Sequence, residues 1–89
     1  MNINVNQVVC IDDSNKPNDI SNKCWVKKNN KYTPIKLVTC KLDEKQFFVL
    51  EEIQPDNPIY GGYNINRFGV DINDILEMIE KGELVEELV

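Results

Sequence analysis

The sequence contains no histidine, a single arginine and no long hydrophobic run. The lack of histidine and the lack of a long hydrophobic run each exclude a class of function. Without histidine, the chain lacks the usual base of a nucleophilic triad and the commonest metal-ligating side chain. The longest uninterrupted apolar run, residues 47–50, is far too short to cross a bilayer. We therefore expect a protein that is not an enzyme, has no catalytic residue, metal site or cofactor, and does not bind a membrane.

Cysteine is also sparse, and its three residues, Cys10, Cys24 and Cys40, are widely spaced. They form no Cys-x-x-Cys pair, so a zinc site is not expected. Their odd number favours three reduced thiols that pack as small hydrophobic side chains, and one disulfide with one free thiol is the alternative. The N-terminal residues show no basic segment followed by an apolar run, so we expect no secretory signal and a cytoplasmic location.

The net charge of −5 is unevenly distributed along the chain. Residues 71–89 contain seven acidic residues and one lysine, whereas residues 16–45 contain eight lysines and three acidic residues. A lysine-rich segment of this kind attracts anions locally, while the acidic C-terminal segment repels nucleic acid.

The length of 89 residues, with 42% hydrophobic and 28% charged residues, suits one compact domain. Apolar and β-branched runs predict five short antiparallel strands at 8–11, 24–26, 32–42, 46–53 and 63–68. Residues 12–23 form a long loop, and Asn29-Asn30 a turn. We expect a mainly β fold, with a small barrel at 1–70 and a C-terminal α-helix and acidic tail at 71–89 packed on it.

Three further details of the elements can be predicted. Pro34 cannot donate a hydrogen bond to a neighbouring strand, so it should lie at an edge or a bulge. After Gly69 the apolar period changes to 3.6, and Ile72, Ile75, Leu76 and Ile79 predict a helix that Asp71 or Asn73 caps and Gly82 ends. Residues 84–89 form a separate element, either a helical turn or a strand.

Several short motifs stand between residues 7 and 69. They are Val-Val-Cys-Ile-Asp-Asp-Ser at 8–14, Trp-Val-Lys-Lys at 25–28 with Tyr-Thr at 32–33, Leu-Glu-Glu-Ile at 50–53, and Tyr-Gly-Gly-Tyr at 60–63 leading to Arg-Phe at 67–68. In these motifs the chain resembles a set of small, mostly uncharacterised bacteriophage and prophage proteins. The resemblance implies an SH3-like barrel and a phage origin. We accordingly expect the cytoplasm of a bacterial host cell as the location and a host protein as the partner.

Two groups of side chains are candidates for binding. The first consists of Trp25, Lys27, Lys28, Lys31 and Tyr32, which form a cationic turn between aromatic residues. The second consists of Tyr60, Tyr63 and Arg67, around a rigid loop that is rich in proline and glycine. Tyrosine and arginine are common anchors at protein interfaces, so we expect a binding module that acts through protein–protein contact.

Other uses of these residues stay open. Lysines beside aromatic rings can bind phosphates and stack bases, so Lys27, Lys28 and Lys31 can also hold a nucleotide or a single-stranded nucleic acid. Asp12, Asp13, Asn15 and Asp19 could ligate a hard cation, but their spacing fits a solvated turn better. The chain is expected to be a monomer, or a homodimer through the helix at 72–80 if its apolar stripe is exposed.

Overall fold

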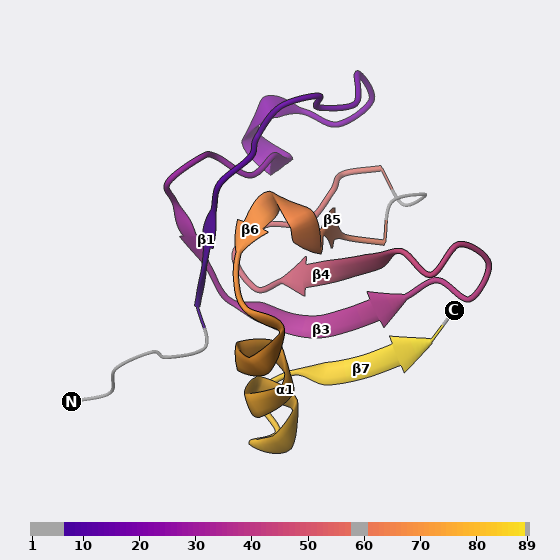
Figure 1. Cartoon of the computed structure of the whole chain (residues 1–89). Coiled ribbons are helices and arrows are strands. Elements are labelled where there is room, and N and C mark those ends of the chain that lie inside the picture. Colours follow the sequence, from indigo (N-terminus) through magenta and orange to yellow (C-terminus); the bar gives the residue numbers. More distant parts are fainter. Residues whose placement is uncertain (1–6, 58–60, 89) are drawn as a thin grey trace.

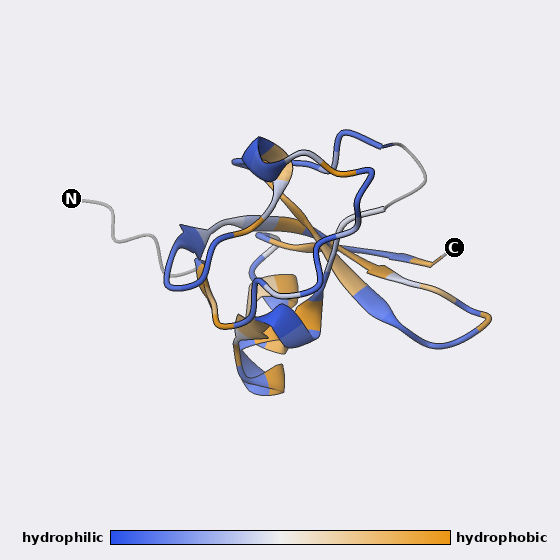
Figure 2. Cartoon of the chain, turned by 90° about the horizontal axis from the view of Figure 1, so that it is seen from above, coloured by the Kyte–Doolittle hydropathy of each residue, from blue (hydrophilic) through white to orange (hydrophobic). Residues whose placement is uncertain are grey.

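A computed structural model of the chain describes residues 7–57 and 61–88. Within these residues, a three-stranded sheet and a four-stranded sheet pack together with one α-helix (Figure 1). Seen from above, the hydrophobic segments concentrate where strands and helix meet, while the loops are mainly hydrophilic (Figure 2). The mainly β character predicted from the sequence is confirmed.

The smaller sheet has the order β2-β1-β6, and both pairings are antiparallel. Its strands are β1 (Val8–Cys10), β2 (Lys31–Tyr32) and β6 (Phe68–Gly69). Val8 and Cys10 are buried whereas Val9 is only partly so, which is the alternation expected of a strand with one face on the core. This sheet brings the first strand, the lysine-rich segment and the end of the predicted fifth strand together.

The larger sheet has the order β5-β4-β3-β7. Its strands are β3 (Pro34–Thr39), β4 (Gln46–Leu50), β5 (Tyr63–Asn64) and β7 (Val85–Leu88). The pairs β3–β4 and β4–β5 are antiparallel, and β7 lies parallel to β3. The register shifts between Pro34 and Lys36, in agreement with the prediction that the proline lies at an edge or a bulge.

Helix α1 (Ile72–Glu80) begins and ends where the sequence predicts. The carboxylate of Asp71 accepts a hydrogen bond from the Asn73 N–H, and Gly82 follows the helix with a φ of 76°. Its buried residues are Ile75 and Met78, whereas Ile72 and Leu76 are 58% and 52% exposed. Ile79 also packs against the core, so two of the four residues in the predicted stripe, Ile75 and Ile79, lie on the buried side of the helix.

The core lies between one face of the larger sheet, the smaller sheet and α1. Phe48 and Leu50 of β4 are fully buried, and the Phe48 ring meets the Phe68 ring edge-on with centroids 5.6 Å apart. Ile75 and Met78 of α1 belong to the same hydrophobic cluster. Both other layers therefore cover the same face of the larger sheet.

Four predictions about the strands are wrong. The two sheets do not close into a barrel, and β7 takes the edge of β3 as a parallel strand, so the described strands are more than five and not all antiparallel. Residues 24–26 are not a strand, because the 3₁₀ turn η1 (Asn22–Cys24) precedes an extended Trp25. The predicted strand at 63–68 is interrupted by a second 3₁₀ turn, η2 (Ile65–Arg67), whose start is capped by Asn64.

Candidate functional site

The candidate site begins where β1 ends, at a tight turn formed by Asp12, Asp13 and Ser14. The Asp12 carboxylate accepts hydrogen bonds from the backbone N–H and the hydroxyl of Ser14, at 2.9 and 2.5 Å. These bonds lower the pKa of Asp12, because they stabilise the carboxylate. Aspartate commonly bonds its own backbone two residues later, which is why this polar segment turns here.

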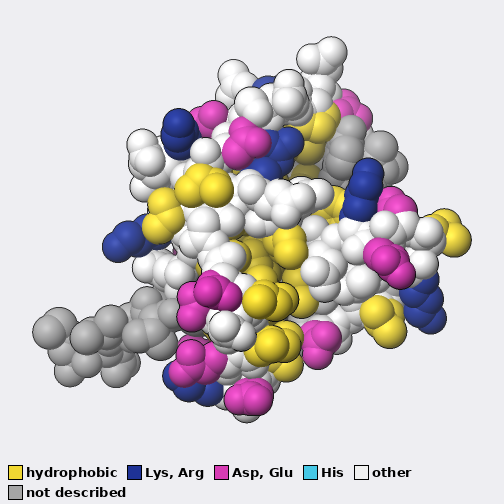
Figure 3. All heavy atoms as spheres, in the orientation of Figure 1, with side chains coloured by type: hydrophobic (Ala, Val, Ile, Leu, Met, Phe, Trp, Pro, Cys, Tyr) yellow, Lys and Arg dark blue, Asp and Glu magenta, His cyan; other side chains and the backbone are white. Residues whose placement is uncertain are grey.

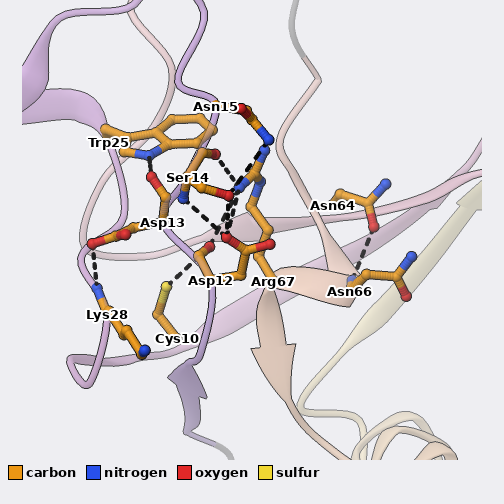
Figure 4. A network of polar contacts seen from close by, with 10 residues as sticks. All are labelled: Cys10, Asp12, Asp13, Ser14, Asn15, Trp25, Lys28, Asn64, Asn66 and Arg67. Carbon is orange, nitrogen blue, oxygen red and sulfur yellow. Dashed lines mark hydrogen bonds and ion pairs between the residues drawn. The ribbon is translucent and has the colours of Figure 1, made fainter.

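Arg67, at the end of η2, reaches across to this turn (Figure 4). Its guanidinium donates to the carbonyl oxygens of Ser14 at 2.7 Å and of Asp12 at 3.3 Å. The same group lies 3.9 Å from the Asp12 carboxylate and 4.6 Å from the centre of the Trp25 ring. Arg67 therefore joins two segments that are more than fifty residues apart in the sequence.

Trp25 is held on three sides. Its indole N–H donates to the Asp13 carbonyl oxygen at 2.7 Å, and its ring meets the Tyr63 ring edge-on with centroids 5.8 Å apart. The Arg67 guanidinium covers one ring face in a cation–π contact. The tryptophan therefore anchors the long loop to the core.

The lysine turn, residues 27–31, has a backbone that is fixed by hydrogen bonds. The Lys27 N–H donates to the Tyr32 hydroxyl at 2.8 Å, and the Lys28 N–H donates to the Asp13 carboxylate at 3.0 Å. The Asn29 N–H donates to the Cys10 carbonyl at 2.7 Å, and Asn29 has the left-handed φ of 75° that the turn prediction requires.

The side chains of this turn point outward. Lys27, Lys28 and Lys31 are all exposed. Within residues 7–57 and 61–88, the ion pairs involve Lys36, Arg67 and Lys81 instead. The three ammonium groups are therefore carried on a fixed backbone without an ion-pairing partner among the described residues.

The structure brings most of the predicted binding residues to one end of the molecule, but their side chains differ in solvent exposure. Tyr32 and Tyr63 are only 6% and 1% exposed and belong to the core. The Tyr63 hydroxyl donates to the Cys24 carbonyl, and burial raises the pKa of Tyr63. Tyr60 lies outside the described residues.

The sequence did not indicate that residues 12–14 connect the two predicted groups. Asp13 alone contacts both Trp25 and Lys28, and the Asp12 and Ser14 carbonyls hold Arg67. The Asp-Asp-Ser sequence signals a turn, but nothing in it shows which distant side chain the turn receives. Among the described residues, no group of three or more potential ligands is arranged to hold a metal ion.

A hollow lies between α1 and β6, away from the lysine turn. It has a volume of about 380 Å³, and its lining includes Asp74, Glu77, Lys81 and Glu83. The Lys81 ammonium is 2.9 Å from the Glu77 carboxylate, so its charge is already paired. Figure 3 shows acidic side chains gathered around the helix, which makes this hollow a poor site for an anion.

No family model matches the chain, and no curated protein or solved structure is significantly similar to it. The resemblance to phage proteins and the SH3-like assignment therefore stay predictions. In the described part of the chain, no helix is long and apolar enough to span a bilayer.

Proposed function

We propose that the protein is a non-catalytic binding module that acts through contact with another protein, and that the lysine turn is its contact site. The observation that carries this proposal is the combination of three exposed lysines with a hydrogen-bonded backbone. A preformed turn loses little conformational entropy on binding, so more of the contact energy appears as affinity.

The chemistry of the partner follows from the charge of the turn. Three lysines within five residues, in a protein of net charge −5, favour an acidic patch on the partner surface. If the phage resemblance holds, this partner is a protein of the bacterial host cytoplasm. Arg67 and Trp25 support the contact by fixing the loop that holds the turn.

Binding of a nucleotide or a single-stranded nucleic acid is the second candidate, since the same lysines can contact phosphates. Stacking of bases needs an open aromatic face. Tyr32 and Tyr63 are buried, and Arg67 covers one face of Trp25. The structure therefore favours the protein-contact proposal over base stacking.

A capture experiment with charge-reversed variants tests the proposal. The immobilised protein is incubated with a bacterial lysate, and captured proteins are quantified by mass spectrometry. We expect one stoichiometric partner for the wild type, and at least a tenfold loss of it for the double variant Lys27→Glu with Lys28→Glu. The fold should survive, because these lysines contribute backbone N–H groups, not side chains, to the turn.

Lys41→Glu with Lys45→Glu is the matched control, since both lysines are exposed in the turn between β3 and β4. Equal loss with both double variants would mean a nonspecific effect of net charge and would overturn the proposed site. Anisotropy titration with single-stranded oligonucleotides at two salt concentrations tests the second candidate. Salt-sensitive binding that needs Lys27 and Lys28, without any protein partner, would replace the protein-contact proposal.

A further inference from the structure

We propose that two copies of this chain associate through the outer face of the four-stranded sheet. This outer face is the side of the sheet turned away from the core. It carries Lys36 and Val38 of β3, Phe47 and Val49 of β4, and Val85 and Glu87 of β7.

The register of the strands places these side chains together. Lys36 is opposite Val49 on one side and Val85 on the other, and Val38 is likewise opposite Phe47 and Glu87. Residues opposite one another in a sheet point to the same face, and alternate residues of one strand do so too. The outer face is therefore two adjacent rows of three side chains, four of the six being apolar.

These apolar side chains do not belong to the core. Val38 is buried but lies outside the core cluster, and Phe47 and Val49 are neither in that cluster nor packed against it. Val85 is 58% exposed. The smaller sheet and α1 both pack on the opposite face, so no other sheet or helix of the described chain packs over this apolar group, in which Val85 is exposed and Phe47 and Val49 are partly exposed.

The charges of the outer face fit a second copy as its occupant. The only charged side chains in the two rows are Lys36 and Glu87, which lie 3.0 Å apart and are 41% and 45% exposed. A two-fold axis through the face can place each lysine near the other copy's glutamate, so the face is complementary to itself. It is also electrically neutral, which matters because two chains of net charge −5 repel each other elsewhere.

The size of the face sets the strength of the association. The face spans three strands that are about 4.8 Å apart, and each strand contributes four residues with a rise of about 3.3 Å per residue. The area of the face is therefore roughly 200 Å². A stable interface buries about 800 Å² on each partner, so the dimer should be weak and reversible. We expect it to form only at high micromolar concentration or above.

Sedimentation equilibrium over a range from micromolar to millimolar protein tests this proposal. The weight-average mass of the wild type should rise from 10.3 kDa toward twice that value. Val85→Glu should raise the dissociation constant at least tenfold, whereas Leu76→Glu, at a helix position of similar exposure, should leave it unchanged. A wild type that stays monomeric, or a dimer that only Leu76→Glu disrupts, would overturn the proposal.

A charge-swap experiment is a second, independent test of the dimer. Lys36→Glu and Glu87→Lys should each dissociate the dimer, because each face then carries two like charges. A mixture of the two variants should associate again as a heterodimer, and the double swap Lys36→Glu with Glu87→Lys should restore the homodimer. If mixing restores nothing while thermal melting shows both variants folded, the two-fold arrangement is wrong.

Discussion

Arg67 is one of the side chains that tie the long loop to the rest of the molecule. It is the only arginine in the chain, and its guanidinium contacts two backbone carbonyls and an aromatic ring at once. A lysine cannot reproduce this arrangement, because an ammonium is a point charge without the flat face and the fork of donors. The order of the lysine turn therefore depends on a residue far away in the sequence.

Replacement of Arg67 should loosen the loop. We expect Arg67→Ala to lower the free energy of unfolding by about 2 kcal/mol, from lost charge-assisted hydrogen bonds and the cation–π contact. Arg67→Lys should recover only part of this loss. Urea unfolding followed by the fluorescence of Trp25, the only tryptophan, measures both the stability and the exposure of the ring. An unchanged emission maximum and midpoint in Arg67→Ala would contradict this role.

Tyr63 makes the stability depend on pH in the alkaline range. Burial raises its pKa above the ordinary value of 10.0, so the folded chain keeps the phenol proton where the unfolded chain releases it. The contribution of Tyr63 is therefore complete below pH 10 and is lost as the pH rises above it. We expect Tyr63→Phe to cost about 1 kcal/mol at pH 8, through the lost bond to the Cys24 carbonyl.

Between pH 10 and pH 11 the wild type should lose about 1 kcal/mol more stability than Tyr63→Phe, because only the wild type has this phenol to ionise. Urea unfolding of both proteins at pH 8, 10 and 11 gives the comparison. Parallel pH profiles for the two proteins would show that Tyr63 ionises equally easily in the folded and unfolded states.

At the scale of elements, the turn into β5 depends on a close approach of two backbones. A Cβ atom on Gly62 would lie 2.9 Å from the Phe48 carbonyl carbon and nearer still to its oxygen, whereas a Cβ on Gly61 would meet nothing within 4 Å. These two adjacent glycines therefore have different roles, although both lie in the same predicted turn.

The two glycines form a matched pair of variants. Gly62→Ala should lower the free energy of unfolding by about 2 kcal/mol, because β5 must move away from β4. Gly61→Ala should change it by less than about 0.5 kcal/mol. Thermal melting followed by circular dichroism measures both. Equal effects of the two variants would mean that the close approach to Phe48 does not constrain this turn.

The elements that the sequence predicts well are those defined by neighbouring residues. The cap at Asp71, the bulge at Pro34 and the left-handed Asn29 each follow from the local chemistry of one or two residues. The pairing of β7 with β3 could not be predicted in this way. Residues 85–88 carry two adjacent glutamates and no clear alternation, and their partner lies about fifty residues earlier.

In the candidate site, too, local features could be predicted from the sequence and contacts between distant segments could not. The sequence indicates the exposed lysines, because a cationic turn on the surface needs no distant partner. It does not show that Tyr63 is buried or that Arg67 bonds the Asp12–Ser14 backbone, since both depend on how separate segments pack. The difference between a contact residue and an anchoring residue is therefore visible only in three dimensions.

At the scale of the whole molecule, the lysine turn, α1 and the outer face of the larger sheet differ in their surface chemistry. The lysine turn is cationic and polar, α1 is bordered by acidic side chains, and the outer face of the larger sheet is apolar and neutral. The proposed partner contact uses the lysine turn, and the proposed contact between two copies uses the sheet. Loss of the dimer should therefore leave partner capture intact.

The most direct test of the account is lysine footprinting of the captured complex. Free and partner-bound protein are acetylated briefly, and the modification of each lysine is measured by mass spectrometry. Lys27, Lys28 and Lys31 should become protected in the complex, while Lys41 and Lys45 should be acetylated equally in both states. Protection at Lys41 and Lys45 with an unchanged lysine turn would contradict this expectation.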